Sequence, residues 1–480
     1  MKKVLSCLLA FAGCLIQSGL FAQDIEKEFA EFEKQQNAAF EQFKKKADAD
    51  FENSLRQAWE EFDAFKPLET HLRLEPPQPV VFDPKVPVTE PVAVPVGEER
   101  TPEDTYEPVE ITMPEVEPAG DVKRTSVLFY GVGIELFTTP AAGLQLKGSS
   151  EADVADAWKY LCKEPYETML YDCLSVKKQY HLNDWAYLLF TKAIGMQLYG
   201  ADKADQITFL QMFLLTQSGY KVRLAKIDGR LRLLIATADN VYGVPYLTMD
   251  GLRYYVFEPF KDGSMSIYTY RNDFADAKNL ISLRMEQAPE LSGTKEDRVW
   301  KPENASWSVR TSVDKNLIDF YRDYPQCDVA VHYHTPMSVS LCAELYAQLK
   351  EAVAGKGQRE AAALLLHFVQ TAFPYQTDGE QFGYEKPNFP DETFYYPYCD
   401  CEDRAMLYAV LVRDLLGLKA VLLDYPNHIA SAVCFTEDVS GDYILLDNGQ
   451  KYIICDPTYI GAPVGVCMEQ YKNVAPGIIR

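Results

Sequence analysis

The chain has 480 residues and carries 70 acidic against 47 basic side chains, a formal net charge of −23. This charge argues against a nucleic-acid partner, because phosphate contacts need patches of lysine and arginine and the chain has no basic stripe. The length allows two or three domains with a sizeable core.

Residues 1–22 have the layout of a secretory signal peptide. Lys2 and Lys3 precede an apolar run that ends near Ile16, and the small residue Ala22 closes the segment. The run is too short to span a bilayer as a helix. The segment therefore predicts an exported protein, periplasmic or extracellular. A lipoprotein acylated at Cys14 is the less favoured alternative, because apolar residues continue past this cysteine.

Residues 23–66 predict an amphipathic, coiled-coil-like helix. They contain no proline, and phenylalanines recur 11 residues apart in two series: Phe29, Phe40, Phe51 and Phe62, then Phe32, Phe43 and Phe65. Eleven residues complete three helical turns, so each series stays on one face of the helix. Two interpretations stay open. The aromatic stripe packs on the protein's own body, or residues 24–66 mediate self-association.

Residues 67–120 form a Pro-rich linker. Between Pro67 and Pro118 there are 12 prolines, among long alternations of Val, Glu and Pro. Such a composition cannot bury a core of its own and is typical of an extended, polyproline-like spacer. The linker is expected either to hold the helix away from the body or to wrap loosely along it.

The rest of the chain reads as two globular units, residues 121–260 and 326–480, joined by a β-rich connecting segment at 261–325. Helical periodicity and strand-like alternation occur in both units. The second unit is expected to open with a strand at 328–341.

The two units align at a constant offset of 198 residues. Residues 205–224 fall on 403–422, and residues 250–259 fall on 448–457. Both copies read as helix, glycine cap, strand, strand, tight turn and strand. We therefore predict a duplicated α+β fold.

The copies differ at three positions of reactive type. The corresponding residues of the second and first copies are Cys401 and Lys203, His428 and Arg230, and Asp456 and Glu258. A joint change at three such positions indicates that they form one constellation in the second copy. The first copy is then a degenerate one.

Cys401 stands at the start of an apolar-periodic helix, with Asp400 as its expected N-cap. The helix dipole and the free N–H groups of the first turn favour a thiolate at this place. The acidic neighbours Glu402 and Asp403 oppose it. Activation of the thiol therefore needs a histidine partner.

His428 follows that helix and one strand, and it opens the next strand. A hairpin around residues 447–449 then leads to a strand that ends at Asp456, beside the strand of His428. A carboxylate in this place can orient the imidazole. Together with Cys401, the pattern is the layout of a cysteine-nucleophile triad.

The same residues resemble the core motif of the transglutaminase-like superfamily. The matching pieces are C-E-D-R-A from Cys401, L-V-R-D-L-L-G-L-K-A from Leu411, then His428, and D-P-T from Asp456. The resemblance implies a papain-like core, in which the helix bearing the cysteine packs on an antiparallel sheet. It also implies that Cys401 is the nucleophile, His428 the general base and acid, and Asp456 the residue that orients it. The chain departs from the motif in two places: Asp400 stands where glycine is common, and no aromatic residue follows His428. These departures weaken an inference about the substrate more than the inference about the fold.

The function that this resemblance implies is acyl transfer at an amide bond of a peptide or protein, through a thioester on Cys401. Hydrolysis, by a protease or amidase, is favoured over crosslinking, because water is always available and no amine site is identified. Two competing hypotheses are an NlpC-type cell-wall peptidase, which the D-P-T ending disfavours, and a catalytically idle scaffold or binding protein on the same fold.

Several other polar residues near the motif are weaker candidates. Gln381 is the expected oxyanion donor and Gln376 the next choice, although a surface glutamine is an equally good interpretation. Cys399 is interpreted as a bystander, with a Cys399–Cys401 redox pair or a metal site as the alternative. No CxxC or HxxxH spacing is present, so we predict no metal and no cofactor.

Overall fold

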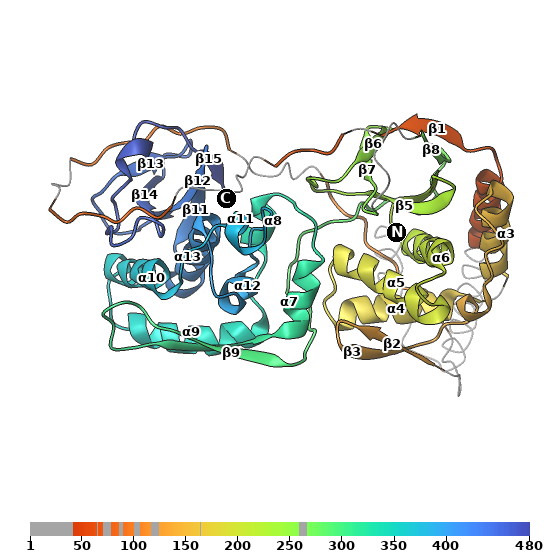
Figure 1. Ribbon diagram of the computed structural model, residues 1–480, viewed down its shortest axis with the longest axis horizontal. Coiled ribbons are helices and arrows are strands. Elements are labelled where there is room, and N and C mark those ends of the chain that lie inside the picture. Colours follow the sequence, from red (N-terminus) through yellow and green to blue (C-terminus); the bar gives the residue numbers. More distant parts are fainter. Residues whose placement is uncertain are drawn as a thin grey trace, which may run out of the picture.

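The computed structural model describes residues 42–64, 66–70, 78–85, 90–99, 106–116, 124–163, 165–258 and 266–480. It shows a mixed α+β protein with two lobes side by side (Figure 1). The predicted signal peptide and residues 23–41 of the predicted N-terminal helix lie outside the described residues. Within them, no helix is long and apolar enough to cross a bilayer.

The first unit contains four long helices and an antiparallel sheet, on the right in Figure 1. Its elements are β1 (Glu60–Asp63), β2 (Thr125–Phe129), β3 (Val132–Leu136), η1 (Ala141–Gly143), α3 (Glu151–Leu161), α4 (Glu167–Gln179), α5 (Asp184–Tyr199), α6 (Ala204–Gln217), β4 (Val222–Ile227), β5 (Arg230–Ala236), β6 (Tyr246–Met249), β7 (Leu252–Tyr255) and β8 (Ser266–Thr269).

The second unit, on the left in Figure 1, follows the same plan with more helices. Its elements are β9 (Lys295–Trp300), β10 (Val309–Asp314), α7 (Lys315–Arg322), α8 (Val329–His334), α9 (Val339–Val353), α10 (Gln358–Ala372), α11 (Asp378–Gln381), α12 (Pro390–Tyr395), α13 (Cys401–Leu416), β11 (Lys419–Tyr425), β12 (His428–Cys434), β13 (Tyr443–Leu445), β14 (Lys451–Cys455), η2 (Glu469–Tyr471) and β15 (Gly477–Ile479).

The main sheets of the two units have the same strand order. The first runs β6-β7-β5-β4-β8, with β1 beyond β8, and the second runs β13-β14-β12-β11-β15. The central strand pairs also share their register at the offset of 198. The matching pairs are Ile227–Arg230 with Tyr425–His428, and Ile235–Tyr255 with Val433–Ile453. Because β8 lies in the first sheet, this unit continues past residue 260, where the sequence places a boundary.

Helix α13 is the element that carries Cys401 into the second unit. Its residues from Cys401 to Val412 are all buried, because α13 packs between the sheet strands β11 and β12 and helix α10. Gly417 ends the helix in the left-handed conformation, with φ of 66°, which glycine adopts without steric cost. The start of α13 is thereby fixed against the sheet.

The N-terminal helix packs on the first unit instead of standing apart. Its described part covers residues 42–55, and it is not helical up to residue 66 as expected, because residues 60–63 form strand β1 and pair with β8. Phe51 is 4% exposed and contacts the ring of Trp158 at 4.7 Å between centroids. Of the two open interpretations, packing on the protein's own body therefore holds for the described end of the helix.

Part of the Pro-rich linker forms a strap along the second unit, which we define as residues 78–85 and 90–99. It pairs with both edges of the sheet: the N–H of Val94 donates to the carbonyl of Tyr443 in β13 at 2.8 Å, and the N–H of Ile478 in β15 donates to the carbonyl of Glu98 at 3.0 Å. Val94 is 3% exposed in the core that the sheet encloses. The described part of the linker thus runs along the second unit, held by backbone hydrogen bonds, and covers two strand edges.

Asp442 anchors the strap, and replacing Asp442 is expected to release the strap from the sheet. The carboxylate is buried and accepts the backbone N–H of Val92 at 2.9 Å and of Cys467 at 3.0 Å. Asp442→Ala leaves both N–H groups without this acceptor, which we expect to lower the free energy of unfolding by about 2–4 kcal/mol. Hydrogen exchange in 92–99 should accelerate. The control Asp447→Ala, at an exposed turn, should change neither the free energy of unfolding nor the hydrogen exchange in 92–99.

Two stretches differ from the β structure that the sequence predicts: the strand expected at 328–341, and residues 280–285 within the segment 261–325 that is expected to be β-rich. Residues 329–334 form helix α8, because Asp328 and the following apolar residues start a short turn that packs on α13. His332 is consequently buried against the ring of Phe389, while His334 is exposed. Residues 280–285 form no strand and make a single isolated bridge, from Ile281 to Thr237.

Candidate functional site

The pairing of β12 with β14 brings His428 and Asp456 together. His428 is the first residue of β12, and Asp456 directly follows the last residue of β14. The two strands are antiparallel, with Ser431 opposite Cys455. The imidazole Nε2 of His428 lies 2.8 Å from Oδ2 of Asp456, and both side chains are almost fully buried, at 1% and 3% exposure. A buried pair at this distance holds the imidazole in one orientation.

The loop after Asp456 holds its carboxylate in place. Oδ1 accepts the backbone N–H of Thr458 at 2.9 Å and of Tyr459 at 3.3 Å. The buried amide Nε2 of Gln370, on α10, donates to the carbonyls of Asp456, Tyr459 and Ala462 at 3.3, 2.8 and 3.1 Å. Sequence reasoning misses Gln370, since its position on an ordinary helix face gives no local signal.

Two tyrosines hold the ring plane of His428. Tyr425 stacks with the imidazole at 6.3 Å between centroids and Tyr471 at 5.2 Å, and the Tyr471 hydroxyl donates to Asn427 at 3.0 Å. Because Nε2 faces Asp456, Nδ1 is the ring nitrogen left to act on a partner. Tyr471 lies 43 residues beyond the histidine in sequence, and no motif marks it.

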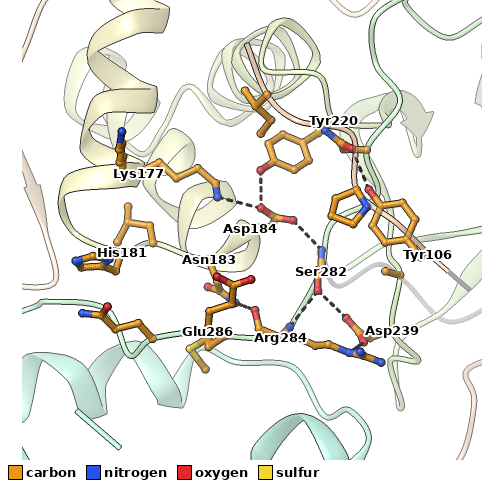
Figure 2. A pocket seen from close by; sticks show the side chains of 18 of the residues that line it. Tyr106, Lys177, His181, Asn183, Asp184, Tyr220, Asp239, Ser282, Arg284 and Glu286 are labelled. Atoms are coloured by element: carbon orange, nitrogen blue, oxygen red, sulfur yellow. Dashed lines mark hydrogen bonds and ion pairs between the residues drawn. The ribbon is translucent and has the colours of Figure 1, made fainter. Parts of the chain in front are cut away.

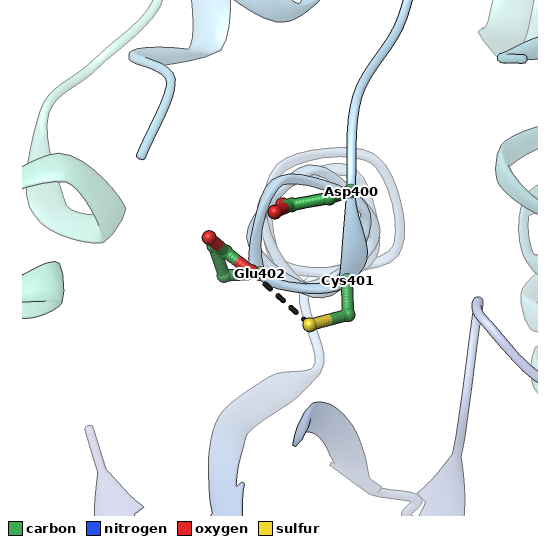
Figure 3. Close-up of side chains that lie close together, drawn as sticks. All are labelled: Asp400, Cys401 and Glu402. Atoms are coloured by element: carbon green, nitrogen blue, oxygen red, sulfur yellow. Dashed lines mark hydrogen bonds between the residues drawn. The ribbon is translucent and has the colours of Figure 1, made fainter. Parts of the chain in front are cut away.

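Cys401 meets the same strand at the residue next to the histidine. Its side chain is 2% exposed, and the nearby backbone N–H of Ile429 acts to lower the pKa of the thiol. The thiol lies 3.1 Å from Oε2 of Glu402, to which it donates, as Figure 3 shows. Burial raises the pKa of the Cys401 thiol well above its usual value, and the charges of Glu402 and Asp400 raise it further. Burial and the neighbouring carboxyls outweigh the effect of the helix dipole, so Cys401 rests as a thiol and not as a thiolate.

A group of buried carboxyls surrounds the start of α13. Its members are Asp378, Glu385, Asp400, Glu402 and Asp403. Burial and the neighbouring Glu402 raise the pKa of Asp378 to about 10 and of Glu385 to about 9. The pKa of Asp400 is raised well above its usual range by the same causes. Asp403 is held by the backbone and side-chain N–H groups of Asn388, both at 2.7 Å.

These raised pKa values predict a stability that falls with rising pH when a chelator removes divalent cations. A carboxyl whose folded pKa lies above its unfolded value stabilises the fold below the unfolded pKa, and this contribution is lost as the pH rises toward the folded pKa. For Glu385 this window runs from about 4 to about 9. In EDTA, Glu385→Gln is expected to raise the free energy of unfolding at pH 8 by at least ~1 kcal/mol and to leave it nearly unchanged at pH 4. Urea titrations at the two pH values measure this; equal effects at both would contradict the assignment.

The two candidate oxyanion donors and Cys399 lie close to the start of α13 in the fold. Gln376 donates its backbone N–H to the carbonyl of Cys399 at 3.2 Å. Gln381 ends α11, and its side-chain amide N and O are both buried without a hydrogen-bond partner in the described part of the chain. Cys399 is buried, and the nine described cysteines are all free thiols. The structure therefore shows no Cys399–Cys401 disulfide.

The corresponding residues of the first unit are not brought together. Arg230 pairs with Asp205 at 2.9 Å, while Glu258 pairs with Arg232 at 3.2 Å. Lys203 stands at the N-cap of α6 and makes no side-chain capping bond. The backbone plan is shared with the second unit, but the side-chain constellation is not.

A cavity of about 990 Å³ lies away from these residues, at the junction of the two units. It is lined by the linker from Tyr106 to Ile111, by the turn between α4 and α5, and by His334. Figure 2 shows its central carboxylate, Asp184, bonded to Tyr220 and Lys177, which lie 2.5 and 3.1 Å away. No cysteine lines the cavity. Several of its polar groups bond to one another, among them Asp184, Tyr220 and Ser282.

Comparisons of the chain with protein-family models, with curated proteins and with solved structures found no match.

Proposed function

We propose that the chain is an exported thiol enzyme of the transglutaminase-like kind, which transfers the acyl group of a peptide or protein amide. The observation that carries the proposal is the buried His428–Asp456 pair, at 2.8 Å, with Cys401 at the start of the helix that packs on the strand of His428. Nucleophile, base and orienting carboxylate come from a helix start and two adjacent strands, as a cysteine triad requires. The shared strand order of the two sheets supports duplication of the fold, with the first copy degenerate.

The reaction would begin from the neutral thiol. As Sγ of Cys401 bonds to the amide carbonyl carbon, its proton passes to Nδ1 of His428, and Asp456 stabilises the imidazolium. The C–N bond breaks and the amine leaves with that proton. Water then adds to the thioester while His428 takes a proton from it. The C–S bond breaks, and the proton returns to the sulfur as the carboxylic acid departs. The unpartnered amide N–H of Gln381 suits the oxyanion of the two tetrahedral intermediates.

Hydrolysis and amine transfer can be separated with one protein substrate. We expect the full mature chain to release fluorescent peptides from fluorescein-labelled casein and to incorporate little monodansylcadaverine into it. Cys401→Ala should abolish both signals, whereas Cys399→Ser should keep them. Full casein hydrolysis by the Cys401→Ala chain would refute this mechanism.

A second candidate function is a catalytically idle scaffold or binding protein on the same fold. The observation that favours it is the state of Cys401, a buried thiol whose hydrogen goes to Glu402 and whose pKa is raised. This candidate predicts that no casein is turned over and that His428→Ala leaves the chemistry of Cys401 unchanged.

A further inference from the structure

Three carboxyls from separate segments converge beside the first turn of α13. Asp378 comes from α11, Glu385 from the loop that follows it, and Glu402 from α13 itself. One oxygen of each lies within 4.8 Å of an oxygen of the others. All three are buried, at 2%, 6% and 2% exposure. Ionised carboxylates this close and this far from water repel one another strongly unless a positive charge lies between them.

Asp400 provides an independent sign that a ligand belongs here. Its side chain is 1% exposed, and neither carboxylate oxygen has a hydrogen-bond donor among the described residues. A buried carboxylate without a partner is costly, and native structures rarely keep one. Figure 3 shows the carboxylates of Asp400 and Glu402 projecting to the same side of the helix start, and atoms of the two residues lie within 4.8 Å. One oxygen each of Glu385 and Glu402 is also unpartnered.

Two cationic side chains lie near this group. Lys386 pairs with Glu392 at 2.6 Å, and Arg404 donates from Nη2 to the backbone carbonyl of Phe373, while its Nε and Nη1 have no hydrogen-bond partner among the described residues. Over the ranges that the structure describes, no lysine or arginine forms an ion pair with Asp378, Glu385, Asp400 or Glu402. The negative charge of this group is therefore balanced by bound protons or by an ion that the protein does not itself supply.

We propose that Asp378, Glu385, Asp400 and Glu402 bind one hard divalent cation of the calcium class. The ligand atoms are all carboxylate oxygens, which Ca²⁺ prefers in sets of six to eight, and carboxylates that bind through one or two oxygens satisfy that number with few waters. Mg²⁺ fits less well, because it keeps several waters and demands a regular octahedron. A soft cation would instead recruit the sulfur of Cys401, which here donates its hydrogen to Glu402. The site requires no catalytic role for Cys401.

Titration calorimetry of the full mature chain, freed of metals by a chelator, tests this site with CaCl2, MgCl2 and ZnCl2 as separate probes. We expect one Ca²⁺ per chain with a Kd between about 10⁻⁷ and 10⁻³ M, and binding of Mg²⁺ at least ~10-fold weaker. Glu385→Gln and Asp400→Asn should each weaken Ca²⁺ binding by at least ~10-fold. The matched control Glu380→Gln, an exposed carboxyl on the same short helix as Asp378, should bind as the unaltered chain does.

A thermal melt of each chain with and without 1 mM CaCl2 gives a second readout that also checks folding. Calcium should raise the Tm of the unaltered and Glu380→Gln chains, and it should raise the Tm of Glu385→Gln by clearly less. The proposal is wrong if 10 mM CaCl2 gives neither heat nor a shift, or if both site variants bind Ca²⁺ unchanged. It is also wrong if Zn²⁺ alone binds and thereby protects Cys401 from alkylation, since that result assigns a soft-metal site.

Discussion

Replacing His428 by alanine is expected to lower kcat/KM for casein hydrolysis by at least ~10³-fold. The structure holds Cys401 as a buried thiol whose pKa is raised, so the sulfur gains nucleophilicity only if a base takes its proton during attack. The described geometry offers Nδ1 of His428 for this purpose, because Nε2 is bonded to Asp456. Losing the base removes both proton transfers of the cycle, and triad residues act as a unit.

A second histidine variant makes this prediction specific to the triad. His181 lines the cavity of about 990 Å³ at the junction of the two units, so His181→Ala removes the same kind of side chain from a place away from the triad. We expect His181→Ala to keep at least half of the casein hydrolysis. If His181→Ala instead abolished casein hydrolysis while His428→Ala kept it, the chemistry would lie at the cavity and the triad would be contradicted. Circular dichroism of both variants shows whether a loss reflects misfolding.

Phe51→Ala is expected to lower the free energy of unfolding by about 3–5 kcal/mol. Phe51 lies in the core of the first unit, with ring centroids 4.7 Å from Trp158, 5.7 Å from Tyr270 and 5.6 Å from Phe274. Its removal leaves a cavity among rigid aromatic side chains that cannot collapse to fill it. Urea unfolding of the full mature chain measures the change.

Phe43 is the matched control from the second phenylalanine series. It belongs to the same helix but is 55% exposed. Phe43→Ala is expected to change the free energy of unfolding by less than about 0.5 kcal/mol. If Phe43→Ala instead destabilises the chain in a manner that depends on protein concentration, residues 24–66 form an interface between copies. Light scattering of the two variants then gives the mass in solution.

Local patterns are enough to predict the elements that carry the site. The helix at Cys401, the glycine cap at Gly417 and the strand that opens at His428 each have a signal within a few residues, and the structure has each of them. The antiparallel neighbours of β12 follow from the short connections along the chain. The closeness of His428 and Asp456 is a consequence of that pairing.

The remaining features depend on tertiary contacts that no local pattern encodes. The hydrogen bond from Cys401 to Glu402 depends on the rotamers of these two adjacent residues. The acidic sequence around Cys401 therefore does not show which carboxyl accepts the bond. The strap has no hydrophobic period, yet it pairs with two strand edges because those edges need partners. In helix α8, residues 331–334 alternate apolar and polar side chains like a strand, and four positions are too few for the period to decide.

The measurement that tests the central claim most directly is the pH dependence of Cys401 alkylation by iodoacetamide, followed by peptide mass spectrometry in the Cys399→Ser full mature chain. If Cys401 and His428 act as a pair, labelling at pH 6–8 should fall at least ~10-fold when His428 is replaced by alanine, because the imidazole then no longer takes the thiol proton. Equal labelling rates in the two chains, rising only at alkaline pH as for an ordinary buried thiol, would contradict the paired site and favour the idle scaffold.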